Sequence, residues 1–405
     1  MKVVIEASPI AFGYENPLAE TGITRVIKNL LVKIDDYCSE NETLFLFSQE
    51  NLWCQFLLNK YLYQSNIKSI FPLINNILLQ YHSDYYYTKD VADLVDVKRD
   101  LESIKFSSDF LEVLAQQTSL FHSHFLPAPD VFRKQCRVVF TVHDIFPLTH
   151  NTLFDDNVAT FYRNYIKSFG FTDVAACVSD YTATQVKSYL PQFNRGNVRT
   201  IYNAADHSAF SENVKTEVLT NLSLEAEHYF LCVSTLEPRK NFPSIIRAFN
   251  SYLQKSKIKR KLVLVGSVGW LSQAETEKID ELVKSNDIVL AGRVNDSDLH
   301  ELLKHAFVFL SGSFCEGFGL GALEAAMQGT LPLVAANTAQ KEVMNGFGIT
   351  LDSWVPSAIS EKLLEIENSP MPMTKTNNRE VITNKYSWAS AALKYVELYR
   401  EMSES

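Results

Sequence analysis

Residues 308–329 read VFLSGSFCEGFGLGALEAAMQG, and this stretch decides the predicted fold. The apolar run Val308–Leu310 is typical of a strand buried in a parallel sheet. Apolar residues then recur at helical spacing, at Leu320, Leu323, Ala326 and Met327. Gly329 follows them, where a glycine can end a helix. The stretch therefore predicts a strand, a loop and a helix, the unit from which layered α/β domains are built.

The loop between this strand and helix combines three glycines with a nearby pair of carboxylates. Gly317, Gly319 and Gly321 stand within five residues, so backbone N–H groups can approach a ligand closely. The helix N-terminus behind them favours an anion. Glu316 lies in the loop and Glu324 about one turn into the helix, with seven residues between them. One carboxylate can therefore face a reacting group while the other accepts hydrogen bonds from hydroxyl groups.

These residues resemble the E-x7-E motif of the retaining glycosyltransferases of family four, which have the GT-B fold. GFGL at 317–320 and LEA at 323–325 stand where that family has them. Gly321 replaces a proline that is usual in the family, so we expect a looser first helical turn with no functional group lost. The competing interpretation is a plain strand–loop–helix unit with solvated glutamates, which the match to the motif disfavours.

Length and composition are those of a globular protein with more than one domain. The chain has 405 residues, enough for two or three domains. Its net charge of −9 argues against a nucleic-acid partner, because phosphate binding needs basic surface. No apolar run approaches a membrane span, and MKVVIEAS at the start reads as a strand rather than a signal peptide. Six scattered cysteines favour reduced thiols in a cytoplasmic protein.

The N-terminal segment predicts a strand, a long loop and an amphipathic helix. The strand spans Lys2–Ser8, the loop Pro9–Glu20, and TGITR at 21–25 opens the helix. A glycine at a helix start after the first strand suits close approach to a phosphate. The segment resembles the family's TGI-x-R, in which the glycine backbone abuts the donor, which makes Gly22 a candidate. An ordinary helix cap is the open alternative, and we expect Arg25 to form a structural salt bridge.

Residues 51–115 give the weakest prediction of secondary structure in the chain. They are rich in Leu, Ile, Tyr and Phe, with helical spacing in places. In the resembling family the corresponding region shapes the acceptor site. For most of it we expect helices that pack on the sheet, and Tyr85–Tyr87 looks exposed.

Two histidines alternate on the predicted strand Leu120–Phe125, so His122 and His124 share one face. With His143 and Asp144 after the next strand, they form a candidate metal site. No further ligand shows a clear spacing, and the resembling family reacts without a protein-held metal, so we predict no metal and no cofactor. The run HSHFLP resembles the family's strand near the acceptor, which makes His122 and His124 candidates for the acceptor side.

The next predicted strand, Arg137–Val142, leads into TVHDIFP at 141–147. This segment resembles the family's TVHDLIP, whose histidine lies beside the reacting sugar. A polar residue at the carboxyl end of a buried parallel strand is where ligands bind in open α/β sheets. The resemblance therefore implies that His143 contacts the sugar and helps to stabilise an oxocarbenium-like state. A histidine that caps a turn is the alternative.

A basic turn follows the predicted strand Tyr229–Ser234. TLEPRKN at 235–241 places Arg239 and Lys240 between a strand and a helix, where two cations suit a diphosphate. Many family members carry an arginine at the place of Thr235, so charge neutralisation rests here on Lys240 with help from Arg239. A solvated basic turn is the alternative.

The D-x-D at Asp296–Asp298 resembles metal-binding pairs of the other major glycosyltransferase fold. Leu299, Leu302 and Leu303 follow it at helical spacing. We therefore predict that these acids cap a helix and hold no metal.

Strand–helix alternation on both sides of residue 206 predicts an α/β architecture. The resemblance implies the GT-B form of it, with two doubly wound Rossmann-like domains that face a central cleft. We expect an acceptor-side domain over residues 1–205, completed by a crossover helix over 385–405. A nucleotide-sugar-binding domain would span 206–384.

The resemblance implies a retaining glycosyltransferase that moves a hexosyl residue from a nucleotide-diphosphate sugar to a saccharide or lipid-linked saccharide. Glu316 would bind the sugar hydroxyls and Glu324 the ribose hydroxyls. The resemblance names as catalytic Glu316, His143 and Lys240. It names as donor-binding Gly22, Arg239, Lys240, Phe318, Gly319, Leu320 and Glu324.

The TLEPRKN form resembles mannosyl- and related deoxyhexosyltransferases of surface polysaccharide assembly, which favours a GDP-sugar such as GDP-mannose. UDP- and dTDP-sugars remain alternative donors. A sugar-nucleotide epimerase would need another acid/base set, and Glu316, Glu324 and Lys240 together disfavour a non-catalytic binding subunit. We expect a cytoplasmic enzyme, with peripheral contact at the inner face of the membrane left open.

Overall fold

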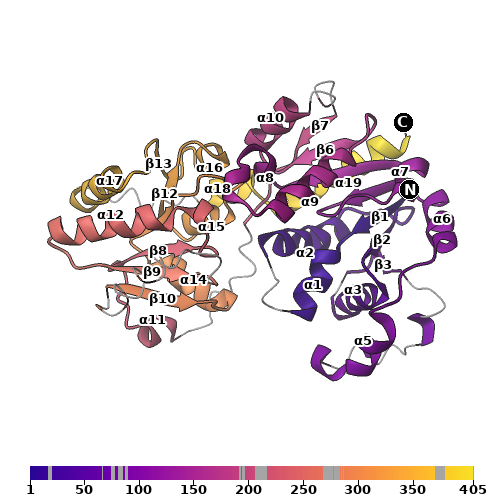
Figure 1. Ribbon diagram of the computed structural model, residues 1–405, viewed down its shortest axis with the longest axis horizontal. Helices are drawn as coiled ribbons and strands as arrows, with labels where there is room; N and C mark the ends of the chain where they lie inside the picture. The colour runs from indigo at the N-terminus through magenta and orange to yellow at the C-terminus, as the bar shows by residue number, and fades with distance from the viewer. Residues whose placement is uncertain are drawn as a thin grey trace. The chain divides into compact units, whose positions relative to one another are not determined.

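The chain divides into two compact units, seen in the computed structural model in Figure 1. Unit 1 comprises Met1–Asn203 and Trp388–Ser405, and unit 2 comprises Ala204–Ser387. The structure describes residues 1–16, 21–65, 67–73, 78–80, 85–86, 90–190, 193, 197–205, 217–267, 277, 283, 285, 287–369 and 379–404. The predicted boundary residue 206, the end of the predicted loop at 17–20, and Tyr87 lie outside these residues.

Unit 1 is built on a seven-stranded parallel sheet of order β3-β2-β1-β4-β5-β6-β7. Its strands are β1 (Lys2–Glu6), β2 (Thr43–Phe47), β3 (Ile70–Pro72), β4 (Leu120–Ser123), β5 (Arg137–Val142), β6 (Val174–Cys177) and β7 (Val198–Thr200). From β1 the chain first builds outward through β2 and β3, and then returns to β4 on the other side. The carboxyl ends of β1 and β4 therefore flank the topological switch point, where open α/β sheets bind ligands.

Helices cover this sheet. They are α1 (Ser8–Glu15), α2 (Gly22–Asp35), α3 (Leu52–Gln64), α5 (Val95–Leu101), α6 (Ser108–Gln116), α7 (Asp130–Gln135), α8 (Phe146–Thr149), α9 (Asp156–Lys167), α10 (Asp180–Tyr189) and α19 (Trp388–Glu404). Short 3-10 turns lie at Leu78–Gln80, Val91–Asp93 and Asn151–Leu153. The predicted helix after TGITR is confirmed as α2, and Thr21 caps it by accepting from the Thr24 N–H.

The predicted loop Pro9–Glu20 is wrong over its first part, because Ser8–Glu15 forms α1. Pro9 lies in the first helical turn, where its missing N–H has no intrahelical partner to lose. The residues at the start of this helix are buried, and it packs against α2 and α3. Tertiary burial therefore forms a helix that the local sequence does not signal.

The C-terminal helix α19 packs against α2 and β4, and is the yellow helix of unit 1 in Figure 1. His122 links it to the sheet, because its Nδ1 lies 2.6 Å from the Tyr399 hydroxyl and its Nε2 lies 2.8 Å from Thr141 Oγ1. The Tyr395 hydroxyl lies 2.8 Å from the same Thr141 oxygen. Both ring nitrogens of His122 thus form hydrogen bonds inside unit 1. This favours a structural role for His122, which holds α19 on the sheet, over contact with an acceptor.

Replacing His122 with phenylalanine is expected to lower the free energy of unfolding by about 2–4 kcal/mol at pH 7. Two buried hydroxyl groups would lose a partner, at about 1–3 kcal/mol each. Burial, helped by the neighbouring His143, lowers the pKa of His122 to about 3. The unfolded chain therefore takes up this proton near pH 6.5 and the folded chain only near pH 3, so this group's contribution falls as pH drops below 6.5.

Urea unfolding at pH 7 and pH 5 tests both parts of this prediction. The cost of His122→Phe should be about 2 kcal/mol smaller at pH 5, because the variant lacks the group that protonates on unfolding. Lys394→Ala, at an exposed position of the same helix, is the control. A cost that is below about 1 kcal/mol at pH 7, or that does not change with pH, would contradict the anchoring role.

Unit 2 is built on a six-stranded parallel sheet of order β10-β9-β8-β11-β12-β13. Its strands are β8 (Tyr229–Val233), β9 (Lys261–Val265), β10 (Ile288–Gly292), β11 (Val308–Ser311), β12 (Leu331–Ala335) and β13 (Ile349–Leu351). Its helices are α11 (Val218–Asn221), η6 (Pro238–Lys240), α12 (Phe242–Lys255), α14 (Asp296–His305), α15 (Leu320–Met327), α16 (Ala339–Val343), α17 (Pro356–Asn368) and α18 (Arg379–Lys385). The switch point of this sheet lies between β8 and β11.

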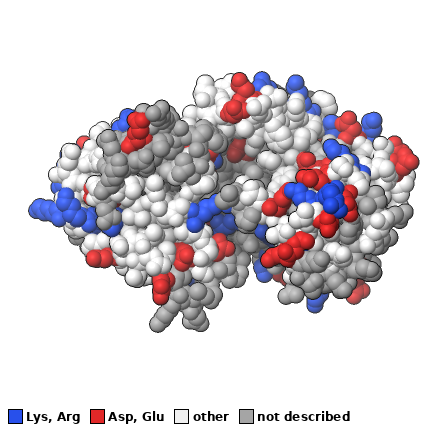
Figure 2. Space-filling view, turned by 60° about the horizontal axis from the view of Figure 1, so that its bottom comes forward, with Lys and Arg blue, Asp and Glu red and all other residues white. Residues whose placement is uncertain are grey.

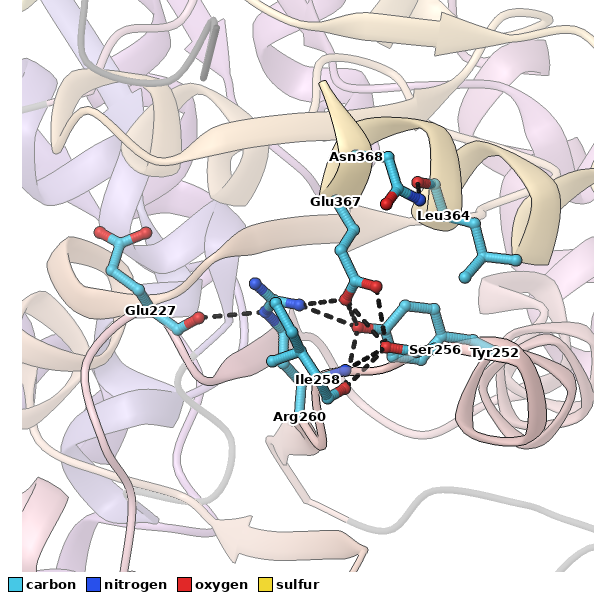
Figure 3. Close-up of polar contacts among 8 residues, drawn as sticks. All are labelled: Glu227, Tyr252, Ser256, Ile258, Arg260, Leu364, Glu367 and Asn368. Carbon is cyan, nitrogen blue, oxygen red and sulfur yellow. Dashed lines mark hydrogen bonds and ion pairs between the residues drawn. The ribbon is translucent and has the colours of Figure 1, made fainter. Parts of the chain in front are cut away.

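A buried ion pair in unit 2 links α17 to the residue before β9 (Figure 3). The Arg260 guanidinium, just before β9, contacts the Glu367 carboxylate near the end of α17, and their side chains are only 7% and 5% exposed. Tyr252 on α12 hydrogen-bonds both partners, and Ser256 Oγ donates to Glu367 Oε1 at 2.8 Å. The Phe307 ring lies 3.7 Å from the guanidinium carbon. The helices α12 and α17 lie side by side in Figure 1, and this network of hydrogen bonds stabilises their contact.

On the face shown in Figure 2, the Lys and Arg side chains occur in small groups among Asp and Glu, without one continuous basic field. Over the described ranges, no helix is both long and apolar enough to cross a membrane. None of the six cysteines, all of which are described, forms a disulfide.

Candidate active site

The loops that follow β8 and β11 meet at the switch point of the unit 2 sheet. After β8 the chain runs into η6, and after β11 it runs through Ser313 and Glu316 to the start of α15. The Phe314 N–H donates to the Arg239 carbonyl at 2.8 Å and joins the two loops. The order of the strands therefore brings together two motifs that are far apart in the sequence.

Lys240 and Glu316 form an ion pair at this junction. The Lys240 Nζ contacts Glu316 Oε1, and Ser313 Oγ donates to the same oxygen at 3.0 Å. Arg239 Nη1 donates to the Cys315 carbonyl at 3.2 Å. The Lys240 and Glu316 side chains are 12% and 17% exposed, so both are sheltered yet reachable.

The charges around this pair favour an ionised Glu316. Burial alone would raise the pKa of the Glu316 carboxyl, but the Lys240 and Arg239 cations hold it below its ordinary value. Burial lowers the pKa of Lys240, and the neighbouring Arg239 cation lowers it further. Glu237 lies 2.6 Å from Arg239 Nε and partly balances that cation. The site thus holds two cations and an ionised Glu316 in a sheltered place.

The glycine-rich loop gives α15 an unusual start. Gly319 precedes the helix with φ +97°, a left-handed conformation that favours glycine. A Cβ there would lie 2.7 Å from Gln340 Cγ, so Gln340 covers this position. Gln340 Nε2 donates to Ser311 Oγ at 2.7 Å, and the Ala339 N–H donates to the Glu316 carbonyl at 3.1 Å. The start of α16 therefore fixes the loop that carries Glu316.

Glu324 and Phe318 lie on either side of the helix start. Glu324 is buried on α15, and the Phe318 ring meets the Tyr386 ring edge-to-face at 5.7 Å. Leu320 is the first residue of α15, as its spacing predicts. The helix ends before Gly329, which has φ +85°.

The predicted helix after the D-x-D is confirmed as α14, but the prediction that an acid caps it is wrong, because the N-cap residue is Asn295. Asn295 caps α14, with its side chain accepting from the Asp298 N–H at 2.8 Å. Asp296 and Asp298 lie in the first helical turn, where they offset the helix dipole. Among the described residues, no three metal-ligating side chains gather in one place.

The remaining sequence-predicted residues belong to unit 1. Gly22 is the exposed first residue of α2. His143 follows β5; burial lowers its pKa to about 4, with a backbone hydrogen bond to His124 opposing this shift. His124 is fully buried, its ring centroid lies 3.9 Å from that of His122, and neither of its nitrogens finds a partner within the described part of the chain. Burial holds the pKa of His124 well below its ordinary value.

Glu6, at the carboxyl end of β1, was missed by the sequence reasoning. It is fully buried, accepts from the Ser8 N–H at 3.0 Å, and burial raises its pKa to about 7. Its strand register pairs it with Ser123, so its side chain lies on the other face of the sheet from His122 and His124. A single acid that ends the apolar run VVIE is the signal that could have pointed to it.

Solved structures share this fold over the whole chain. Sucrose-phosphate synthase from Thermosynechococcus elongatus has a TM-score of 0.68 at 16% identity, covering 99% of this chain and 98% of the other. WaaG, a glycosyltransferase involved in lipopolysaccharide biosynthesis, has a TM-score of 0.62 at 12% identity, covering 98% and 99%. Residues 215–387 match glycosyl transferases group 1, and residues 82–209 match Glycosyltransferase Family 4.

The chain is a GT-B glycosyltransferase. The predicted α/β GT-B architecture and the predicted hexosyltransferase enzyme are thereby confirmed.

Curated relatives of this glycosyltransferase include O-antigen mannosyltransferases. O-antigen chain mannosyltransferase B of Escherichia coli is 26% identical over 271 residues, which cover 65% of this chain and 70% of that protein. The serotype-specific mannosyltransferase WbdA of Escherichia coli is 25% identical over 262 residues, covering 61% of this chain but only 31% of WbdA. O-antigen chain mannosyltransferase RfbU of Salmonella typhimurium is 21% identical over 238 residues, covering 59% and 63%.

Proposed function

We propose that this glycosyltransferase moves a mannosyl residue from GDP-mannose to a saccharide or lipid-linked saccharide, with retention of anomeric configuration. The observation that carries the proposal is the sheltered Lys240–Glu316 pair beside the glycine start of α15. Several curated relatives are O-antigen mannosyltransferases, which supports the sugar and a role in surface polysaccharide assembly. The form TLEPRKN of the basic turn supports a GDP-sugar, and a UDP- or dTDP-sugar is the second candidate.

Departure of the nucleotide diphosphate builds negative charge on its phosphate oxygens. Lys240 and Arg239 would stabilise that charge, together with the first N–H groups of α15 and, from unit 1, the Gly22 backbone. An ammonium group has three N–H donors, so Lys240 can contact Glu316 and a phosphate at once. The cations thus serve the step in which the sugar–phosphate bond breaks.

Glu316 would position the sugar. Its Oε1 accepts from both Lys240 and Ser313, and no described residue donates to Oε2, which supports Oε2 as the acceptor for a sugar hydroxyl. Glu324 would accept from the ribose hydroxyls. In unit 1, His143 would contact the sugar. His124 would belong to the acceptor side. A lipid-linked acceptor would bring the enzyme to the inner face of the membrane.

A donor screen by thermal shift tests this proposal. At a concentration 100 times its dissociation constant, a bound donor adds about 2.7 kcal/mol to stability. GDP-mannose should raise the Tm more than UDP-glucose, dTDP-glucose or ADP-glucose. A larger shift with UDP- or dTDP-glucose would overturn the GDP assignment, and no shift with any of the four would overturn the donor class.

Activity is expected to survive a strong chelator, because cationic side chains serve the diphosphate at this site. Turnover with and without EDTA, at constant ionic strength, checks this expectation. Loss of turnover with EDTA and its return with magnesium or manganese would contradict it. That outcome would bring Asp298 and His124 back as candidate ligands.

A further inference from the structure

Asn241 combines three features that a purely structural residue does not need. It follows Lys240 in the loop between β8 and α12, and it has φ +57° and ψ +35°, the left-handed region. Residues other than glycine rarely adopt this region, although asparagine is among the more tolerant. Strained backbone of this kind concentrates at functional sites.

The side chain of Asn241 does not cap α12, although the residue stands at the N-cap position. Asn241 is the N-cap residue of α12, a helix of 14 residues, where an asparagine usually accepts a hydrogen bond from the first turn. No such capping bond forms here. The N-terminal N–H groups of α12 are therefore not satisfied by this side chain.

The amide donor of Asn241 is buried without a partner. The residue is 4% exposed, and its Nδ2 finds no hydrogen-bond acceptor in the described part of the protein. Buried donors are almost always paired, so an unpaired one beside a functional site needs an explanation. The backbone fixes its place, because the Asn241 N–H donates to the Pro238 carbonyl at 3.0 Å and the Asn241 carbonyl accepts from Ile245 at 3.3 Å.

The chemistry around this donor suits an anion. Lys240 and Arg239 precede it, and the positive end of α12 follows it. An unpaired N–H donor at the N-terminus of a helix, next to a lysine, matches the oxygens of a phosphate. We propose that Asn241 is a donor-binding residue whose side-chain amide donates to the diphosphate of the nucleotide sugar. This inference rests on the proposed function.

Asn241→Gly separates a binding role from a backbone role. Glycine adopts φ +57° freely, so this variant should fold as stably as the wild type or more stably. If the amide binds the diphosphate, the affinity of this variant for GDP should fall by about 10- to 100-fold. This is the loss of affinity expected when one hydrogen bond to a charged group is removed. Asn241→Asp keeps the shape but replaces the donor by a carboxylate, so its affinity should fall further.

Titration calorimetry with GDP, and with UDP in parallel, gives the affinities, and thermal unfolding gives the stabilities. Ser223→Gly is the matched control, because Ser223 also has a positive φ, of 52°, but lies on an exposed turn after α11. That variant should bind as the wild type does. If Asn241→Gly binds GDP as tightly as the wild type, the inference is overturned and the proposed function stands. A wild type that binds neither nucleotide overturns both.

Discussion

Replacing Lys240 with alanine is expected to lower kcat by about 30- to 1,000-fold, which corresponds to about 2–4 kcal/mol of barrier. The Lys240 ammonium is held by Glu316 in a sheltered place and needs little reorganisation when charge develops on the leaving diphosphate. Its contribution should therefore grow as the sugar–phosphate bond breaks, which is why turnover rather than binding should suffer most. Lys341→Ala, at an exposed lysine of α16, is the control.

The two glutamates should give different kinetic signatures. Glu316→Gln keeps the shape of the side chain but removes its charge beside the reacting sugar, so turnover should fall while GDP still binds. Glu324→Gln should mainly raise the KM for the donor, because contacts to the ribose are made equally in the ground and transition states. Steady-state kinetics of the folded variants and titration with GDP decide the matter. Wild-type kinetics in both Lys240→Ala and Glu316→Gln would favour a solvated turn with no catalytic role.

Replacing Glu367 with alanine is expected to lower the free energy of unfolding by about 3–5 kcal/mol, the usual cost of leaving one member of a buried ion pair alone. The Arg260 guanidinium would lose its counter-ion while it stays covered by the Phe307 ring. Tyr252 and Ser256 would lose an acceptor as well. The contact of α12 with α17 should therefore weaken, and unit 2 should unfold at a lower urea concentration.

A double replacement distinguishes the ion pair from simple packing. Arg260→Met combined with Glu367→Leu removes both charges and keeps apolar volume, so it should cost much less than Glu367→Ala alone. Glu365→Gln on the same helix is the control, because Glu365 is 68% exposed in its pair with Lys362 and should change stability little. Equal losses in the single and double variants would show that the buried charges are not the cause.

The sequence predicted the strands well, because the buried parallel strands read as apolar runs. β5 matches its predicted bounds, and β8 ends one residue before the predicted end. The strands β3 and β13 were not predicted, since each has only three residues at an edge of its sheet. Short edge strands carry too few residues to show a period.

Burial of polar side chains is a feature that the sequence does not reveal. In α3, the polar residues Gln55, Asn59 and Lys60 are all buried. Gln55 Nε2 donates to Asn59 Oδ1 at 3.1 Å, and Lys60 Nζ donates to the Tyr86 carbonyl at 3.0 Å. Partners of this kind are set by the tertiary fold, so periodicity alone cannot reveal them.

At the candidate site, sequence motifs identify the residues, but only the fold shows which of them are in contact. The motifs named Lys240 and Glu316, but only the adjacency of β8 and β11 shows that they touch. The alternation of His122 and His124 is visible in the sequence, whereas Tyr399, which uses one ring nitrogen of His122, comes from the other end of unit 1's chain. The buried state of Asn241 has no local signal either, because asparagine after a lysine looks like an ordinary helix cap.

Release of GDP from GDP-mannose, with analysis of the glycoside formed on a mannose-containing oligosaccharide, tests glycosyl transfer most directly. The wild type should release GDP and form a product with the anomeric configuration of the donor, and Lys240→Ala should do so about 30- to 1,000-fold more slowly. A product of inverted configuration would contradict retention. Equal rates of GDP release by the wild type and by Lys240→Ala would contradict the placement of the reaction at the Lys240–Glu316 pair.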